Sequence, residues 1–225
     1  MTDLVVSEIF GPTFQGEGPS TGRSAMFLRL GRCNLTCTWC DTAYTWDWER
    51  FDPATELRRM PAADVVAALD RIGAPLLVIT GGEPLLQQRR LAPIVEAAHE
   101  RGWQVEIETN GTLVPQLPVD GWNVSPKLAN SGVPAHLRLV PHALREFAAT
   151  GRARAKFVVA DAVELDEVAA VVALAGFTDV WIMPEAATAA ALVERSAALA
   201  PAVLERGWNL SSRLHVLLWG DRRGV

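Results

Sequence analysis

All three cysteines of the chain lie in the stretch Cys33-Asn34-Leu35-Thr36-Cys37-Thr38-Trp39-Cys40. A disulfide framework normally spreads an even number of cysteines along a secreted chain, so three crowded thiols indicate a metal site instead. Thiolates favour iron–sulfur clusters, zinc or copper. A closed zinc site needs a fourth ligand, and none of the four scattered histidines has ligand spacing to the cysteines. An iron–sulfur cubane held by three thiolates keeps one iron open for a small chelating molecule.

The cysteine stretch follows a short apolar run, Ala25–Leu30, which is the first of several predicted strands. The others are Leu76–Thr80, Gln104–Glu108, Trp122–Ser125, Ala155–Val159, Val180–Met183 and Leu214–Leu218, all short and apolar like buried parallel strands. Helical patterns between them predict helices over Pro61–Ile72, Leu91–Arg101, Pro141–Ala149, Glu164–Ala175 and Ala187–Arg206. This alternation predicts an α/β fold with a mostly parallel sheet, open or closed into a partial barrel, as a single domain over residues 1–225.

Polar motifs follow the predicted strands at their carboxyl ends. Gly81-Gly82-Glu83-Pro84 comes after the second strand, Thr109-Asn110-Gly111 after the third and Ser125-Pro126-Lys127 at the end of the fourth. In parallel α/β folds, ligands gather at this edge of the sheet. The two glycines would let backbone carbonyls approach a cationic group, whose charge the carboxylate of Glu83 would complement. Each motif taken alone also fits an ordinary turn.

The composition narrows the class of protein. The chain has 225 residues, 49% of them hydrophobic, which suits one domain with a sizeable core. It carries 21 basic and 26 acidic residues, so no basic surplus points to nucleic acid as a partner. The first residues show no export signal, and no apolar stretch reaches the ~18 residues needed to span a bilayer. We therefore expect a cytoplasmic protein with neither a membrane nor a nucleic-acid partner.

The cysteine spacing, with the aromatic Trp39 before the last cysteine, resembles the signature of the radical S-adenosylmethionine (SAM) superfamily. The resemblance implies a partial (βα) barrel and a 4Fe–4S cluster on Cys33, Cys37 and Cys40, with SAM chelating the open iron. The Gly-Gly-Glu-Pro and Ser-Pro-Lys motifs also resemble SAM-binding segments of that superfamily. The SAM contacts carried over are Trp39, Cys40, Asp41, Gly82, Ser125, Pro126 and Lys127.

The opening segment Glu8–Gly18 is rich in glycine, and Gln15 adds an amide that can bind the edge of a planar heterocycle. Arg29, on the strand before the cysteines, has a planar guanidinium suited to a substrate carboxylate, although an ordinary ion pair is the alternative. With Cys40-Asp41-Thr42 and the final Trp219–Val225, these segments resemble the 7-carboxy-7-deazaguanine synthase family.

That narrower resemblance implies a lyase that converts 6-carboxy-5,6,7,8-tetrahydropterin into 7-carboxy-7-deazaguanine with loss of ammonia, on the path to queuosine and other deazapurines. Its implied substrate contacts are Phe14, Gln15, Gly16, Arg29, Thr80 and the terminal carboxylate of Val225. It also implies Mg²⁺ at Thr42, an electron donor such as flavodoxin, and a homodimer.

Two alternatives remain at this point. A glycyl-radical activating enzyme would share the cluster and the Gly-Gly-Glu-Pro motif but would act on a protein. The Phe-Gln-Gly-Glu-Gly segment and the Arg-Gly-Val end argue against it. The other alternative is a zinc-stabilised binding module without enzymatic activity.

Overall fold

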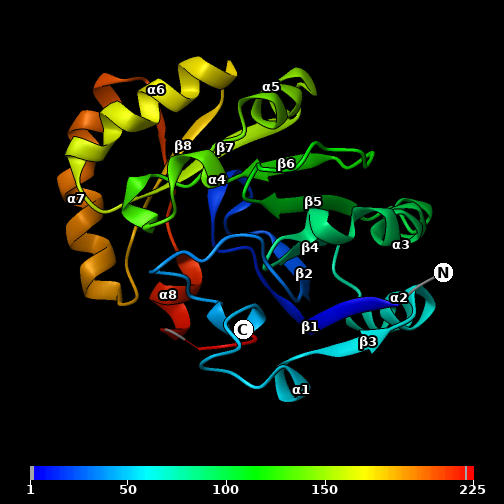
Figure 1. Cartoon of the computed structure of the whole chain (residues 1–225). Helices are drawn as coiled ribbons and strands as arrows, with labels where there is room; N and C mark the ends of the chain where they lie inside the picture. The colour runs from blue at the N-terminus through cyan, green and yellow to red at the C-terminus, as the bar shows by residue number, and fades with distance from the viewer. Residues whose placement is uncertain (1–2, 221) are drawn as a thin grey trace.

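The structure, a computed structural model, describes residues 3–220 and 222–225. Its framework is one nine-stranded sheet in the order β3-β1-β2-β4-β5-β6-β7-β8-β9. β1 (Leu4–Phe14) is antiparallel to β2 (Ser24–Leu30) and to β3 (Arg58–Met60). The remaining strands are parallel to β2 and to one another: β4 (Leu76–Gly81), β5 (Gln104–Thr109), β6 (Gly121–Val124), β7 (Ala153–Val159), β8 (Val180–Pro184) and β9 (Asn209–Leu210). The sheet curves into a partial barrel, as the sequence predicts (Figure 1).

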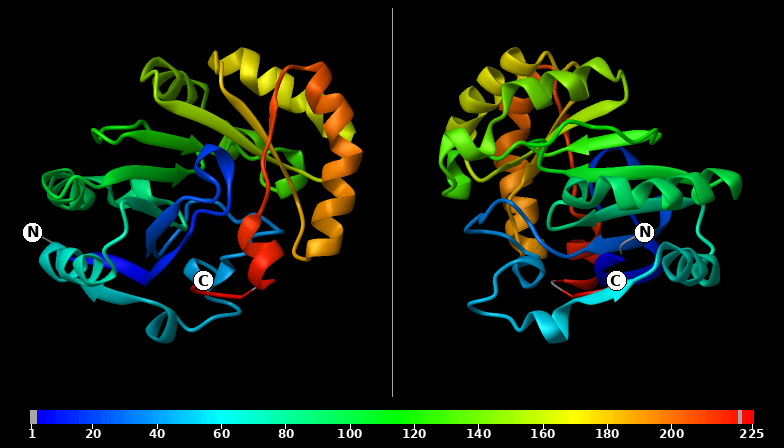
Figure 2. Two further views of the ribbon diagram at one scale, coloured as in Figure 1. Left: turned by 180° about the vertical axis from the view of Figure 1, so that it is seen from behind. Right: turned by 45° about the vertical axis from the view of Figure 1, so that its right-hand side comes forward.

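Helices cover the outer face of the curved sheet (Figure 2). They are α2 (Ala62–Ile72), α3 (Gln88–Glu100), α5 (Pro141–Ala149), α6 (Leu165–Ala175) and α7 (Ala189–Glu205), all predicted from the sequence with small shifts at their ends. The other α-helices of the described residues are short: α1 (Pro53–Glu56), α4 (Ala135–Arg138) and α8 (Leu214–Trp219). No helix of the described residues is long and apolar enough to cross a membrane.

The two faces of the sheet differ in polarity because successive strand residues point to opposite sides. On β5, Val105 and Ile107 belong to the main apolar core together with residues of the covering helices. The alternate positions Glu106 and Glu108 point into the barrel, where Glu108 pairs with Lys156 of β7. The main apolar core therefore lies between sheet and helices, whereas the inside of the barrel is polar along β5 and apolar where Phe27 of β2 and Val78 of β4 pack together.

The predicted strand over Leu214–Leu218 is wrong, because this segment is the helix α8. A short apolar run does not distinguish a strand from a helical turn. In α8 only Val216 is buried, whereas Leu217 and Leu218 are exposed, so the run covers a surface and does not extend the sheet.

The glycine-rich opening segment Glu8–Gly18 is mostly a strand. Its residues up to Phe14 form β1, and the register with β2 shifts between Phe10 and Thr13, so Gly11 and Pro12 lie at an irregularity inside a strand. The loop begins only at Gln15. The edge strands β3 and β9, which are exposed and very short, were not predicted either.

Candidate active site

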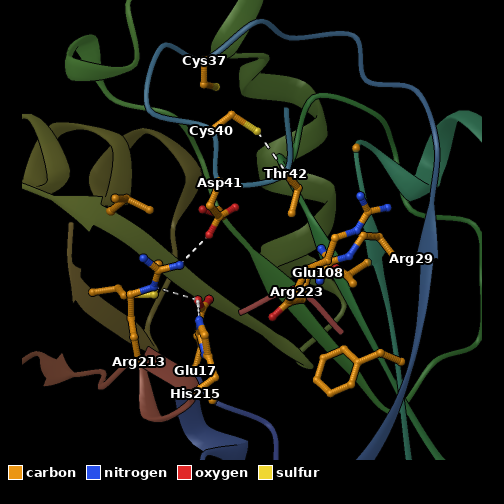
Figure 3. Close-up of a pocket in the computed structure, with 18 of the residues that line it drawn as sticks. Glu17, Arg29, Cys37, Cys40, Asp41, Thr42, Glu108, Arg213, His215 and Arg223 are labelled. Carbon is orange, nitrogen blue, oxygen red and sulfur yellow. Dashed lines mark hydrogen bonds and ion pairs between the residues drawn. The ribbon is translucent and has the colours of Figure 1, made fainter. Parts of the chain in front are cut away.

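A cavity of about 420 Å³ opens at the carboxyl ends of the parallel strands (Figure 3). It brings together nearly all the residues predicted from the sequence: Phe14, Gln15, Gly16, Arg29, Cys33, Cys37, Trp39, Cys40, Asp41, Thr42, Thr80, Gly82, Ser125, Lys127 and Val225. Pro126 is the exception, because it is buried behind the wall and does not line the cavity. Its volume lies within the range of small-molecule and cofactor sites.

The cysteine loop forms one end of the cavity, and its sulfur atoms are approached by N–H donors. The backbone N–H of Leu35 donates to Cys33 Sγ at 3.4 Å, and the indole N–H of Trp46 donates to Cys40 Sγ at 3.3 Å. The three cysteines are free of disulfides and pack together with Leu35 and Val133. Donors aimed at sulfur suit thiolates that hold an iron–sulfur cluster, whose properties such hydrogen bonds tune.

Burial raises the pKa of Cys33 to about 12 and also raises that of Cys37. These thiols need a bound cation to persist as thiolates, which is the form that ligates iron. Within the described residues, no three His, Cys, Asp or Glu side chains converge closely enough to hold a single metal ion. The thiolates of a cubane each bind a different iron, so they lie further apart than the ligands of one ion.

The glycines that end β4 pack directly against the cysteine loop. The N–H of Gly82 donates to the carbonyl of Leu30 at 3.0 Å, and the N–H of Glu83 donates to the carbonyl of Arg32 at 2.8 Å. A Cβ on Gly82 would overlap the Arg32 carbonyl oxygen, so only glycine allows this approach. The backbone of the Gly-Gly-Glu-Pro motif thereby fixes the start of the cysteine loop.

Glu83 does not face the cavity as the sequence suggested. Its side chain is fully buried and turned toward the loop after β5. Its two carboxylate oxygens accept hydrogen bonds from Thr109 Oγ1, Asn110 N and Leu85 N at 2.8–2.9 Å. Glu83 therefore joins the segment after β4, which carries Leu85, to the end of β5 and the loop after it, which carry Thr109 and Asn110.

We expect Glu83→Gln to lower the free energy of unfolding by about 2 kcal/mol, because the new amide N–H₂ would face a buried N–H or O–H donor. Urea unfolding followed by circular dichroism measures the change. Glu205→Gln, at the exposed end of α7, is the matched control and should change stability by less than about 0.5 kcal/mol. Equal stabilities of the two variants would contradict the structural role of Glu83.

Ser125 and Lys127 enter the cavity just after β6, next to the cysteine loop. Lys127 Nζ donates to Ser125 Oγ at 2.8 Å and lies 5.5 Å from the centroid of the Trp39 ring. The N–H of Ser125 is in turn held by the carbonyl of Thr109 at 2.7 Å. A hydroxyl, a cation and an aromatic face thus meet beside the cysteines.

A buried group of charges, absent from the sequence prediction, lies deeper in the barrel. Lys156 of β7 pairs with Glu17 and with Glu108, the latter at 3.3 Å, and Arg213 pairs with Glu17 and Asp41. Although burial acts to raise it, Lys156 and Arg213 hold the pKa of Glu17 well below its usual range. We call Glu17, Glu108, Lys156 and Arg213 the buried charge group. The clue in the sequence is Lys156, one of two lysines in the chain, at an inward position of an apolar strand.

Two predicted substrate residues converge on Glu108 of this group. Thr80 Oγ1 donates to Glu108 Oε2 at 2.8 Å, and Gln15 Nε2 donates to Glu108 Oε1 at 3.3 Å. Gly16 is packed against His215 of α8, and its carbonyl accepts a hydrogen bond from the N–H of Leu214 at 2.8 Å. The C-terminal helix is therefore docked on the loop that carries Gln15.

Arg29, on β2, also lines the cavity. Its Nε pairs with Glu8 Oε2 at 2.9 Å, and its guanidinium lies 5.6 Å from the centroid of the Phe10 ring. Burial raises the pKa of Tyr44, whose hydroxyl donates to the same Glu8 oxygen at 2.9 Å. Val225, at the end of the chain, lines the cavity nearby.

Comparison with known proteins agrees with these features. The family model described as "Radical SAM superfamily" matches residues 28–147. A 7-carboxy-7-deazaguanine synthase of Hyperthermus butylicus is 38% identical, over 96% of this chain and 93% of its own length. A protein of the same name from Bacillus subtilis is 31% identical, over 99% of this chain and 98% of its own length. The crystal structure of QueE from Escherichia coli superposes with a TM-score of 0.72 and 27% identity, covering 95% of each chain.

The family model covers more than half of the chain, and the two relatives cover nearly all of it. The matched region contains the cysteine loop, the two glycines after β4 and the Ser-Pro-Lys segment. The chain therefore belongs to the radical SAM superfamily and, within it, to the 7-carboxy-7-deazaguanine synthase family.

Proposed function

We propose that this cavity converts 6-carboxy-5,6,7,8-tetrahydropterin into 7-carboxy-7-deazaguanine with loss of ammonia, in queuosine and deazapurine biosynthesis. The observation that carries the proposal is the layout of one cavity of about 420 Å³. Its wall combines three thiols with the guanidinium of Arg29 and with Val225. Relatives over nearly the full length of the chain carry the name of this activity.

Cys33, Cys37 and Cys40 would hold a 4Fe–4S cluster, and the residues around them fit SAM. When bound together, cluster and SAM supply reductive cleavage of the sulfonium and a carbon-centred radical. Beside the thiols, Trp39 offers an aromatic face, Ser125 a hydroxyl and Lys127 a cation. These groups suit SAM, which joins a nucleoside to an amino acid. Asp41 and Gly82 complete this wall. Pro126 acts behind the wall, where its fixed φ sets the path between Ser125 and Lys127.

The opposite half of the cavity offers groups that match the pterin. Gln15, Thr80 and Glu108 present an amide, a hydroxyl and a carboxylate, which can hydrogen-bond the edge of a planar heterocycle. Arg29 offers a guanidinium for the substrate carboxylate. Phe14 stacks on Trp219 with ring centroids 6.3 Å apart, so this aromatic pair shields the rim. These residues would orient the reacting carbon of the pterin toward bound SAM and keep water away from that carbon.

Thr42 would hold Mg²⁺ with the help of the substrate. Its hydroxyl lines the cavity 3.6 Å from Cys40 Sγ, whereas the carboxylate of the neighbouring Asp41 is engaged by Arg213. Mg²⁺ binds oxygen ligands and often keeps few from the protein, the rest coming from substrate and water. A magnesium ion held by Thr42 would supply positive charge to complement the substrate carboxylate.

The family resemblance further supports a cytoplasmic homodimer and a small redox protein such as flavodoxin as electron donor. The radical chemistry needs one electron from outside the chain, and a dimer is testable by the mass of the protein in solution.

We expect Arg29→Lys to weaken binding of 6-carboxytetrahydropterin about 10–100-fold, because lysine lacks the planar fork that binds a carboxylate at two points. The binding of tetrahydropterin without the 6-carboxylate should hardly change. Anoxic calorimetry of the reconstituted, SAM-loaded protein measures both affinities.

The matched control is Arg23→Lys, because Arg23 is an exposed arginine just before the same strand. This variant should bind both pterins like the wild type. An unchanged affinity of Arg29→Lys for the carboxylated pterin would remove the carboxylate-binding role of Arg29. Failure of the wild type to prefer the carboxylated pterin would count against the proposed substrate itself.

A further inference from the structure

The side chain of Trp46 donates a hydrogen bond to one of the three cysteines proposed to hold the cluster. Its indole Nε1 lies 3.3 Å from Cys40 Sγ, and Trp46 also lines the cavity. Indole has one N–H and no acceptor atom, so the sulfur must accept this bond. Accepting is the role open to a thiolate that binds iron, because a thiolate carries negative charge and no proton.

The other contacts to cysteine sulfur are longer. Cys33 Sγ accepts from a backbone N–H at 3.4 Å, and the amide nitrogen of Asn110 lies 4.0 Å from it. The Thr42 hydroxyl lies 3.6 Å from Cys40 Sγ, where it can either donate or accept (Figure 3). Among the described residues, Trp46 therefore makes the shortest hydrogen bond to a cysteine sulfur, and its donor is a side chain that a substitution can remove.

The fold of the segment after the cysteines holds the indole in this position. Ala43–Thr45 form a single 3₁₀ turn, and the backbone N–H of Trp46 donates to the carbonyl of Ala43 at 3.0 Å. Thr45 is fully buried, and its carbonyl accepts a hydrogen bond at 2.6 Å from the N–H of Arg32, just before the first cysteine. Backbone hydrogen bonds thus fix the segment that carries the indole against the start of the cysteine loop.

We propose that Trp46 is a positioning residue that raises the reduction potential of the cluster through its hydrogen bond to Cys40. The inference rests on the proposed function, in which Cys33, Cys37 and Cys40 hold the cluster. On reduction the cluster gains one electron from the external donor, and no bond is formed or broken. The added negative charge lies partly on the sulfur atoms, so the N–H donor stabilises the reduced form more than the oxidised form.

The test replaces Trp46 by phenylalanine, which keeps an aromatic ring and removes the N–H. At a fixed solution potential we expect Trp46→Phe to lower the ratio of reduced to oxidised cluster about tenfold. This ratio corresponds to a midpoint potential about 60 mV more negative than that of the wild type. An anoxic redox titration of the reconstituted protein, without SAM or pterin, measures the midpoint from the electron paramagnetic resonance signal of the reduced cluster.

The matched control is Trp48→Phe, the same substitution two positions further along the chain. Trp48 is 40% exposed and does not line the cavity, so this variant should have the midpoint of the wild type. Trp46→His should recover at least half of the shift, because Nε2 of the imidazole ring takes the place of the indole Nε1 and can carry a hydrogen.

Two results would overturn the role of the hydrogen bond. One is a midpoint of Trp46→Phe equal to that of the wild type. The other is a histidine variant no closer to the wild type than the phenylalanine variant, which would assign the shift to lost packing. Loss of the cluster from Trp46→Phe alone would place Trp46 in retention of the cluster and would likewise overturn the tuning.

The titration separates this inference from the proposed function, because it uses no substrate. A wild type that loads the cluster but makes no deazaguanine overturns the proposed function, and the midpoints of the variants still decide the role of Trp46. A wild type that takes up no iron and sulfide overturns both the cluster ligands and the tuning.

Discussion

Replacing Cys37 by alanine is expected to abolish formation of 7-carboxy-7-deazaguanine. Cys37 is the buried member of the three cysteines, packed with Leu35 and Val133 at the end of the cavity. With two thiols left, the loop cannot hold a cubane that keeps only one iron open. The protein should also bind less iron and sulfide on anoxic reconstitution, while its circular dichroism spectrum stays that of the folded chain.

The control for this variant is Thr36→Ala, in the same loop. Thr36 is exposed and does not line the cavity, so its loss should leave both iron content and turnover close to those of the wild type. Normal turnover by Cys37→Ala would show that the three cysteines do not hold the reactive cluster.

The second large effect is expected for Lys156→Met in the buried charge group. Lys156 is 6% exposed and pairs with Glu17 and Glu108, so the substitution leaves Glu108 without its cation and Glu17 with Arg213 alone. We expect a loss of about 2 kcal/mol in the free energy of unfolding, less than for a fully buried pair because both carboxylates keep some exposure. Misplacement of Glu108, which holds Thr80 and Gln15, should also lower kcat/KM about 100-fold.

The stability difference between wild type and Lys156→Met should depend on pH. The folded-state pKa of Glu17 is lowered, so its ionised form contributes stability above the pKa of the unfolded chain, near 4.5, and this contribution is lost as pH falls through the lower folded value. The difference should therefore be largest at neutral pH and should shrink in acid.

Urea unfolding at several pH values tests this expectation. Arg206→Met removes a cation from an exposed pair with Asp166 and should cost less than about 0.5 kcal/mol at every pH. A Lys156→Met variant as stable as the wild type at neutral pH would show that the buried charge group does not stabilise the barrel.

The sequence predicted the outer face of the sheet well and its inner face poorly, for one physical reason. Apolar residues such as Val105 and Ile107 pack on helices, and their pattern is visible within a single strand. The partners of Lys156 are not visible in that way, because Glu17 lies 139 positions away and only the curvature of the sheet brings the two together. The same holds for the ion pair between Arg223 and Glu8, which come from opposite ends of the chain.

The cavity itself was largely predictable because its motifs are local. The cysteine spacing, Gly81-Gly82 and Ser125-Pro126-Lys127 each follow a parallel strand, and such strand ends meet at one edge of a sheet. The error over Leu214–Leu218 arose because its four apolar residues show no clear period; the structure makes this segment a helix, which is docked on Gly16. The direction of the Glu83 side chain was likewise set by neighbours outside its own motif.

The most direct measurement is product formation by the anoxically reconstituted protein with SAM, Mg²⁺, a reductant and 6-carboxytetrahydropterin, followed by mass spectrometry. We predict 7-carboxy-7-deazaguanine only when both SAM and the reconstituted cluster are present. If 5′-deoxyadenosine accumulates and no deazaguanine forms, the radical SAM assignment stands, but the substrate proposed for this cavity is contradicted.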